Sequence, residues 1–107
     1  MSKDYNFQVH TNIMRALKRS NEIIPNSNFT TLDGNILCMI KSFSDSGYPF
    51  FMSDKEIADN NNTSEKTVQR SIKRLCEAGL LVSTRDGPRK RYLEYKPDAM
   101  QKLMDLQ

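Results

Sequence analysis

The chain has 107 residues, of which 16 are Lys or Arg and 13 are Asp or Glu, and its formal net charge is +3 at pH 7. A chain of this length forms one domain and buries enough apolar surface to fold without disulfides or metal. It is too short for an enzyme with separate cofactor and substrate domains. The longest apolar run has five residues, whereas a membrane span needs about 20. The amino terminus also lacks a secretory signal pattern, so we expect a cytoplasmic protein with no membrane partner.

Residues with catalytic or metal-binding chemistry are scarce. His10 is the single histidine, Cys38 and Cys76 are isolated between apolar residues, and the four glycines do not form a phosphate-binding loop. A structural zinc site needs four ligands at close spacing. The sequence therefore predicts no enzyme, no metal and no cofactor, with both cysteines as buried free thiols.

Two helices are predicted in the first half of the chain. The first covers residues 11–20 and carries three apolar residues at helical spacing, Ile13, Met14 and Leu17. The second begins after Thr31, which is predicted to cap it, and must end before Gly47. Its apolar stripe is wide enough to form the centre of the core.

The middle of the chain combines a short strand pattern with a helix start. Residues 48–52 are aromatic and contain a proline, which favours a brief edge strand. Ser53 stands three residues before Glu56, the spacing of a capping box, and predicts a helix over residues 54–60. The asparagine-rich residues 60–63 then predict a tight turn.

The last third of the chain predicts a longer helix, a hairpin and a final helix. The helix covers residues 65–78 and ends at Gly79, which favours a left-handed stop. Residues 80–95 alternate around a turn at 86–88 and predict a β-hairpin. Pro97 then opens a helix over residues 97–106.

This order of elements predicts a mainly α fold with a small β-hairpin, of the α+β class. Two helices joined by a tight turn and followed by a hairpin form a helix-turn-helix with an appended wing. We expect one domain over residues 1–107, with a core at about 30–95 and extra amino- and carboxy-terminal helices.

Residues 64–81 resemble the recognition-helix motif of bacterial winged helix-turn-helix proteins, in which TVxRxIxxLxxxGL leads directly into the wing. Residues 53–58 are similar to the first motif helix of the same proteins. Within that group the likeness is to replication initiators and small regulators of Gram-positive plasmids and phages, and to MarR-type and GntR-type regulators. The resemblance implies a winged helix that binds double-stranded DNA.

The charge distribution points to the same partner. Residues 64–91 hold eight basic and three acidic side chains, a net charge of +5, and the rest of the chain carries −2. On residues 65–78 the side opposite the apolar stripe of Val68, Ile72, Leu75 and Cys76 is mostly cationic, with one internal pair expected between Lys73 and Glu77. A basic helix and hairpin of this kind favour a polyanion.

The candidate DNA-binding residues fall into three groups. Those at the start of the longer helix can reach base edges in a major groove: Ser64, Lys66, Thr67, Gln69 and Arg70. Those expected on phosphates are Ser53, Lys55, Thr63, Lys73 and Arg74. Those of the wing, expected on a minor groove or its phosphates, are Arg85, Arg89, Lys90 and Arg91. Six to eight phosphate contacts predict a log–log salt slope of about −5 to −7.

A homodimer is expected because one such domain covers only half of a typical site. Candidate dimer residues are the apolar stripes of the terminal helices: Ile13, Met14, Leu17, Met100, Leu103 and Met104. The alternative is that these stripes cover the core of their own domain.

Several functions share this sequence pattern. A transcriptional regulator, a replication-origin binder and a plasmid-partition centromere binder would look alike, and the latter two would add a second protein of a replication or partition complex. Replication initiators usually continue into a further domain, which makes partition or regulation at least as strong an expectation. An alternative from a different functional class is a winged-helix protein-interaction module without DNA binding, whose basic face binds an acidic protein surface.

Overall fold

The computed structural model describes the backbone of residues 2–86 and 90–106 and the side chains of residues 10–85 and 91–106. Within these residues, five helices and one antiparallel hairpin follow in the order α1 (Ser2–Ile23), α2 (Thr31–Asp45), α3 (Asp54–Asn60), α4 (Glu65–Glu77), β1 (Leu81–Asp86), β2 (Lys90–Tyr95) and α5 (Pro97–Met104). The predicted fold class, mainly α with a small β-hairpin, is confirmed.

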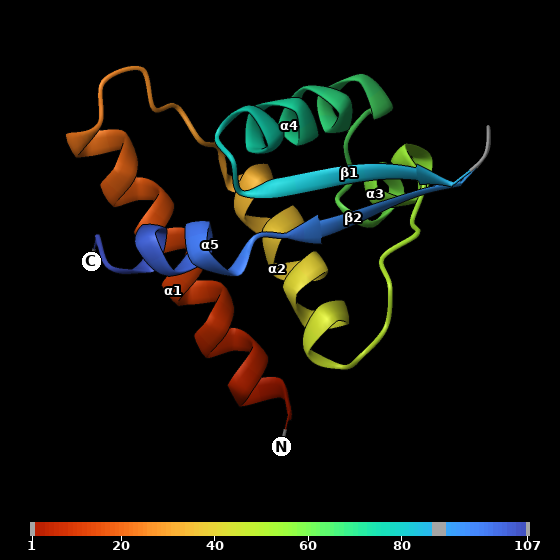
Figure 1. Cartoon of the computed structure of the whole chain (residues 1–107), viewed down its shortest axis with the longest axis horizontal. Coiled ribbons are helices and arrows are strands. Elements are labelled where there is room, and N and C mark those ends of the chain that lie inside the picture. Colours follow the sequence, from red (N-terminus) through yellow and green to blue (C-terminus); the bar gives the residue numbers. More distant parts are fainter. Residues whose placement is uncertain (1, 87–89, 107) are drawn as a thin grey trace.

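Helix α2 occupies the centre of the molecule (Figure 1). It packs against α1, α4 and β2, while α5 packs against α1 and α3 packs against α4. Its inward side chains Ile36, Leu37 and Ile40 are almost completely buried, as the predicted stripe required. The motif helices and the hairpin thus share one core with both terminal helices.

The local signals in the middle of the chain are confirmed. The Ser53 hydroxyl accepts from the Glu56 amide at 3.1 Å, and the Glu56 carboxylate accepts from the Ser53 amide at 3.0 Å. Asn62 in the turn has φ 53°, and Gly79 after α4 has φ 80°. Both residue types tolerate this left-handed conformation, which ends the preceding helix and redirects the chain into the next element.

Two predicted helix starts are wrong. Helix α1 begins at Ser2 rather than at residue 11, because the helical spacing of Ile13 and Leu17 continues backward through Val9. The cap of α2 is Thr30 rather than Thr31. The Thr30 hydroxyl and the Asp33 carboxylate cap each other's amides, whereas Thr31 would have Gly34 at the reciprocal position and no carboxylate to complete the box.

The predicted edge strand over residues 48–52 is reduced to a single bridge between Phe50 and Leu93. The Leu93 amide donates to the Phe50 carbonyl at 3.1 Å. Pro49 has no amide hydrogen to extend the ladder, and the cap of α3 at Ser53 turns the chain away three residues later. Phe50 itself is buried, so the segment contributes packing rather than sheet.

Gly34 lies where α1 crosses α2. A Cβ added there would overlap the Met14 sulfur and would lie 3.3 Å from Leu17 Cδ1. Alanine in a helix is normally up to about 1 kcal/mol more favourable than glycine. We expect Gly34→Ala instead to lower the free energy of unfolding by about 1 to 3 kcal/mol, because it overpacks this crossing. Urea denaturation of the variant measures the change.

A second substitution isolates the cause of that loss. Met14→Ala in the same chain removes the side chain that the new methyl would meet, so the double variant should lose less stability than the two single losses added together. A Gly34→Ala protein at least as stable as the wild type would contradict the close approach.

Candidate nucleic-acid interface

Helices α3 and α4 are joined by a turn whose backbone is closed internally. The Thr63 amide donates to the Ala58 carbonyl at 3.0 Å, and the Asn61 side-chain amide donates to the Ile57 carbonyl at 2.8 Å. Ile57 and Ala58 are buried against α4. The angle between the two helices therefore has both polar and apolar support.

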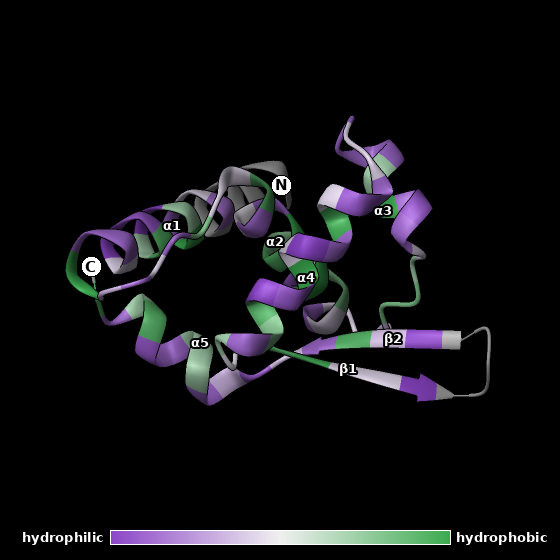
Figure 2. Cartoon of the chain, turned by 90° about the horizontal axis from the view of Figure 1, so that it is seen from above, coloured by the Kyte–Doolittle hydropathy of each residue, from purple (hydrophilic) through white to green (hydrophobic). Residues whose placement is uncertain are grey.

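One side of α4 faces the core and the other faces solvent. Val68, Ile72 and Leu75 are buried, as predicted, whereas Cys76 is half-buried and Ser71 is buried beside them. The view onto α4 shows mostly hydrophilic colour on its outward side, with α3 beyond one end and the hairpin alongside (Figure 2). The two motif helices and the wing thus border one polar side of the molecule.

Three cations on the outward side of α4 are free to meet a ligand. Lys66, Arg70 and Lys73 are exposed, and no hydrogen bond or ion pair within the described part of the chain engages them. The predicted ion pair between Lys73 and Glu77 does not form within the described part of the chain. Gln69 and Thr67 are exposed on the same helix, so the first two turns present amide, hydroxyl and cationic donors together.

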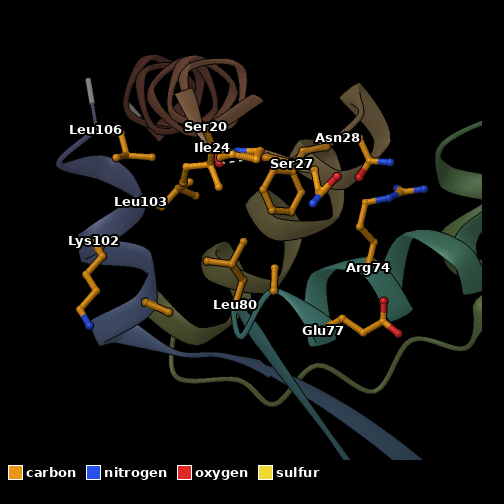
Figure 3. Close-up of a pocket in the computed structure, with 15 residues that line it drawn as sticks. Ser20, Ile24, Ser27, Asn28, Arg74, Glu77, Leu80, Lys102, Leu103 and Leu106 are labelled. Atoms are coloured by element: carbon orange, nitrogen blue, oxygen red, sulfur yellow. Dashed lines mark hydrogen bonds between the residues drawn. The ribbon is translucent and has the colours of Figure 1, made fainter. Parts of the chain in front are cut away.

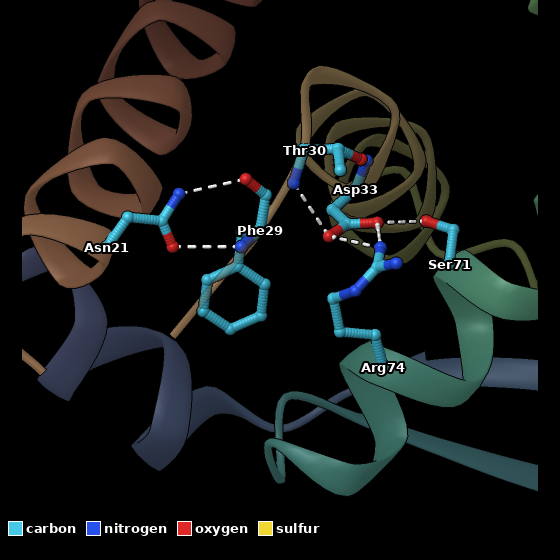
Figure 4. A network of polar contacts seen from close by, with 6 residues as sticks. All are labelled: Asn21, Phe29, Thr30, Asp33, Ser71 and Arg74. Atoms are coloured by element: carbon cyan, nitrogen blue, oxygen red, sulfur yellow. Dashed lines mark hydrogen bonds and ion pairs between the residues drawn. The ribbon is translucent and has the colours of Figure 1, made fainter. Parts of the chain in front are cut away.

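Arg74, predicted to contact the DNA backbone, is directed into the protein instead. Its Nη1 lies 2.8 Å from Asp33 Oδ1 and 2.9 Å from Asp33 Oδ2, and only 29% of the side chain is exposed. The Ser71 hydroxyl donates to Asp33 Oδ1 as well. Arg74 thus neutralises a completely buried carboxylate (Figure 4), and its charge is already paired inside the protein.

Arg91, predicted in the DNA-contacting wing, is also an internal anchor. Its Nη1 lies 2.5 Å from Asp54 Oδ1, and its Nη2 donates to the Met52 carbonyl at 2.9 Å. Arg85 stands directly opposite Arg91 in the hairpin, and two like charges at that position would repel. Asp54 compensates this repulsion and ties the turn end of the hairpin to the start of α3.

Of the remaining wing cations, Arg85 is the one whose side chain the structure describes. Arg85 is exposed and has no internal partner among the described residues. Arg89 and the side chain of Lys90 lie outside the described residues.

The predicted hydroxyl contacts with DNA coincide with helix caps. The Ser64 hydroxyl accepts from the Thr67 amide at 3.2 Å and lies 2.8 Å from the Thr67 hydroxyl. Ser53 caps α3 in the same way, and Thr63 is half-buried. Lys55 is exposed and forms a surface pair with Asp59 at 3.2 Å, a contact weak enough to exchange for a phosphate.

The predicted dimer residues lie in or beside the core of their own chain. Ile13, Leu17, Met100 and Leu103 are buried and Met14 and Met104 are half-buried, because α1 and α5 pack on each other and α1 also packs on α2. Four of the six therefore pack into the core of their own domain, and Met14 and Met104 keep part of their surface exposed. The large apolar side chains that are exposed include Ile23 and Ile24 at the end of α1, which are 46% and 45% exposed, as well as Phe43, Tyr48, Phe51 and Val82.

A cavity of about 550 Å³ lies where the ends of α1, α4 and α5 meet. Figure 3 shows Arg74 and Glu77 of α4 on one side, Leu103 and Leu106 from the carboxy-terminal segment on another, and Ser20 and Ile24 above them. Arg74 therefore belongs both to the wall of this cavity and to the contact with Asp33.

The two cysteines are free thiols in half-buried positions. Burial is the main reason that the pKa of each thiol is raised above its usual value, so both remain protonated at neutral pH. The described residues hold no group of three His, Cys, Asp or Glu placed to bind a metal ion. In this part of the chain, no helix has the length and apolar character that crossing a bilayer requires.

Sequence reasoning overlooked Asp33 as part of this region. The spacing of Thr30 and Asp33 is a local capping signal that could have located the carboxylate at the start of α2. Its pairing with Arg74, 41 residues later, has no local signal.

Solved structures of three transcription regulators share this fold. The adhesin competence repressor AdcR of Streptococcus pyogenes is 20% identical, with 98% of this chain and 69% of that chain covered and a TM-score of 0.58. MepR, a regulator of the Staphylococcus aureus efflux pump MepA, is 13% identical, with 99% and 73% covered and a TM-score of 0.60. BldR of Sulfolobus solfataricus is 20% identical, with 98% and 67% covered and a TM-score of 0.54.

At these identities the likeness establishes a shared fold. No curated protein sequence matches the chain. A family described as a helix-turn-helix domain matches residues 28–81, which include α2, α3, α4 and the start of β1. The match extends over half of the chain and contains both motif helices, and the protein therefore belongs to this family of helix-turn-helix domains.

Proposed function

We propose that this protein binds double-stranded DNA in a sequence-specific way and regulates transcription. The observation that carries the proposal is the outward side of α4, where Lys66, Arg70 and Lys73 are exposed and have no partner among the described residues. Membership of the helix-turn-helix family and the likeness to solved structures of transcription regulators support it. In this role α4 lies in a major groove and the wing lies on the adjacent backbone or minor groove.

The donors of α4 divide between bases and phosphates. Arg70 can take guanine through two hydrogen bonds, and Gln69 can do the same with adenine. Lys66 and Thr67 stand near the helix start, where base edges come within reach. Lys73, one turn after Gln69, is placed for the flanking backbone, together with Arg85 and, in the wing, Arg89 and Lys90.

A dimer of two such domains would read two half-sites. We propose that residues 1–107 act as one domain and that association involves the exposed Ile23 and Ile24, since most of the residues first expected at the interface are buried in their own domain. Binding to a replication origin or to a partition site would use the same contacts with DNA in a more specific biological role. A repeated sequence beside the gene, next to a gene for a filament-forming ATPase or GTPase, would favour partition.

Salt dependence tests the proposal directly. With Arg74 and Arg91 engaged internally, four to six cations remain for phosphates, so the log–log slope should be about −4 to −5 per bound chain. The measurement is fluorescence anisotropy over a salt series, on a duplex selected from a random pool and on its scrambled version. Tighter binding to the selected duplex is expected.

Two outcomes would contradict the proposal. A flat salt dependence would exclude phosphate neutralisation as the source of affinity. Binding to neither duplex would favour the alternative in which the basic surface meets an acidic protein.

A further inference from the structure

We propose that Asp33 is a positioning residue for DNA recognition, which sets the orientation of α4 and thereby the discrimination between DNA sequences. The inference rests on the proposed function and deepens it. It assigns a role to a side chain that is completely buried and cannot touch DNA itself.

Both oxygens of the Asp33 carboxylate are occupied. Oδ2 accepts from the Thr30 amide at 2.9 Å and from Arg74 Nη1 at 2.9 Å. Oδ1 accepts from Arg74 Nη1 at 2.8 Å and from the Ser71 hydroxyl. The start of α2 and two positions one turn apart on α4 therefore meet at one carboxylate (Figure 4).

The segment that contains Thr30, one of the donors to the Asp33 carboxylate, is in turn hydrogen-bonded to α1. The Asn21 side-chain amide donates to the Phe29 carbonyl at 2.8 Å, and the Phe29 amide donates to Asn21 Oδ1 at 2.8 Å. These bonds connect the end of α1 to the segment that leads into Thr30. The position of the Asp33 carboxylate, to which α4 is hydrogen-bonded, therefore depends on both α1 and α2.

Apolar packing alone leaves the rotation of α4 loosely determined. Val68, Ile72 and Leu75 contribute non-directional burial, and the carboxy-terminal half of α4 borders the 550 Å³ cavity through Arg74 and Glu77. Open space on that side offers little steric resistance to a turn of the helix. The hydrogen bonds to Asp33 are directional and supply the missing constraint.

A small rotation is enough to affect recognition. Turning a helix by about 20° moves side-chain atoms at its rim, about 5 to 6 Å from the axis, by about 2 Å. A hydrogen bond does not survive such a shift. Arg70 and Lys73 directly precede Ser71 and Arg74, so any rotation that releases Asp33 also moves the residues proposed to face the DNA.

The variant Asp33→Asn tests this role because it keeps the size of the side chain but cannot satisfy all of its donors. We expect affinity for the selected duplex to fall about 10-fold or more, as one lost base contact would cause. Affinity for the scrambled duplex should stay within about twofold, and the salt slope should not decrease, because no phosphate contact is removed. Anisotropy titrations measure all three quantities, and circular dichroism gives the folded fraction.

The matched control is Asp45→Asn, which makes the same change on the same helix. Asp45 is partly exposed and pairs with Lys41 at 2.7 Å, away from α4. We expect it to leave the ratio of the two affinities unchanged. If Asp33→Asn does not fold, Ser71→Ala removes a single donor from the carboxylate, and it should lower the ratio in the same direction.

The outcomes separate the two proposals. Equal losses on both duplexes, after correction for the folded fraction, would overturn the positioning role and leave DNA binding intact. A wild-type protein that does not distinguish the duplexes would contradict the proposed function and the positioning role together. A lowered ratio in Asp33→Asn or Ser71→Ala, with Asp45→Asn unchanged, supports the positioning role.

Discussion

Replacing Arg70 with alanine is expected to weaken binding to the selected duplex by about 1 to 3 kcal/mol, roughly 5- to 150-fold. Arg70 is exposed on α4 and makes no contact inside the described part of the chain, so its removal should cost the fold less than about 0.5 kcal/mol. Binding to the scrambled duplex should weaken far less, because a base contact carries the discrimination. Anisotropy titration on both duplexes measures the difference.

Two further variants sharpen the test of Arg70. Arg15→Ala removes an exposed arginine from α1 and should leave the ratio of the two affinities unchanged. Arg89→Ala combined with Lys90→Ala should weaken binding to both duplexes alike, since wing cations on the backbone carry no sequence information. Equal losses on both duplexes from Arg70→Ala would contradict the division between base and backbone contacts.

Replacing Arg74 with alanine is expected to act on stability first. It leaves the Asp33 carboxylate buried without its countercharge, and such a loss costs about 3 kcal/mol when the remaining charge is fully enclosed. Arg74 is 29% exposed whereas Asp33 is 0% exposed, which places the expected loss at the lower end for buried pairs. Urea denaturation measures the free energy of unfolding.

Arg70→Ala is the matched comparison, because it makes the same substitution one turn earlier on the same helix. A stability loss in the Arg74 variant, with little change in the Arg70 variant, would separate an internal anchor from a ligand-facing cation. Equal stability of the two variants would show that the Asp33 pair contributes little to folding.

The role of a cation on α4 could not be inferred from its position on the helix alone. Helical spacing placed Lys66, Arg70, Lys73 and Arg74 together, opposite the apolar stripe. The first three are exposed and unpaired within the part of the chain that the structure describes, whereas Arg74 reaches Asp33. A long arginine at the edge of a polar arc can turn to either side, and the nearest carboxylate decides which.

The same limit applies to the terminal helices. Apolar spacing predicted helices near residues 11–20 and 97–106, and α1 and α5 contain the expected apolar residues. The pattern could not say whether these residues meet their own core or a second chain. Packing of α1 on α2 and α5 buries Ile13 and Leu17 and leaves Ile23 and Ile24 exposed.

Elements with local signals follow from the spacing of residues along the chain: the capping box at Ser53 and Glu56, the turn at Asn62, the stop at Gly79 and the apolar stripe of α4. Each depends on residues within one or two turns of chain, so spacing alone specifies it. The partners of Arg74 and Arg91 depend instead on how the helices pack, because these arginines lie 41 and 37 residues from their carboxylates. Such contacts form only after the helices have packed, because burial at that stage forces each charge to find a counterion.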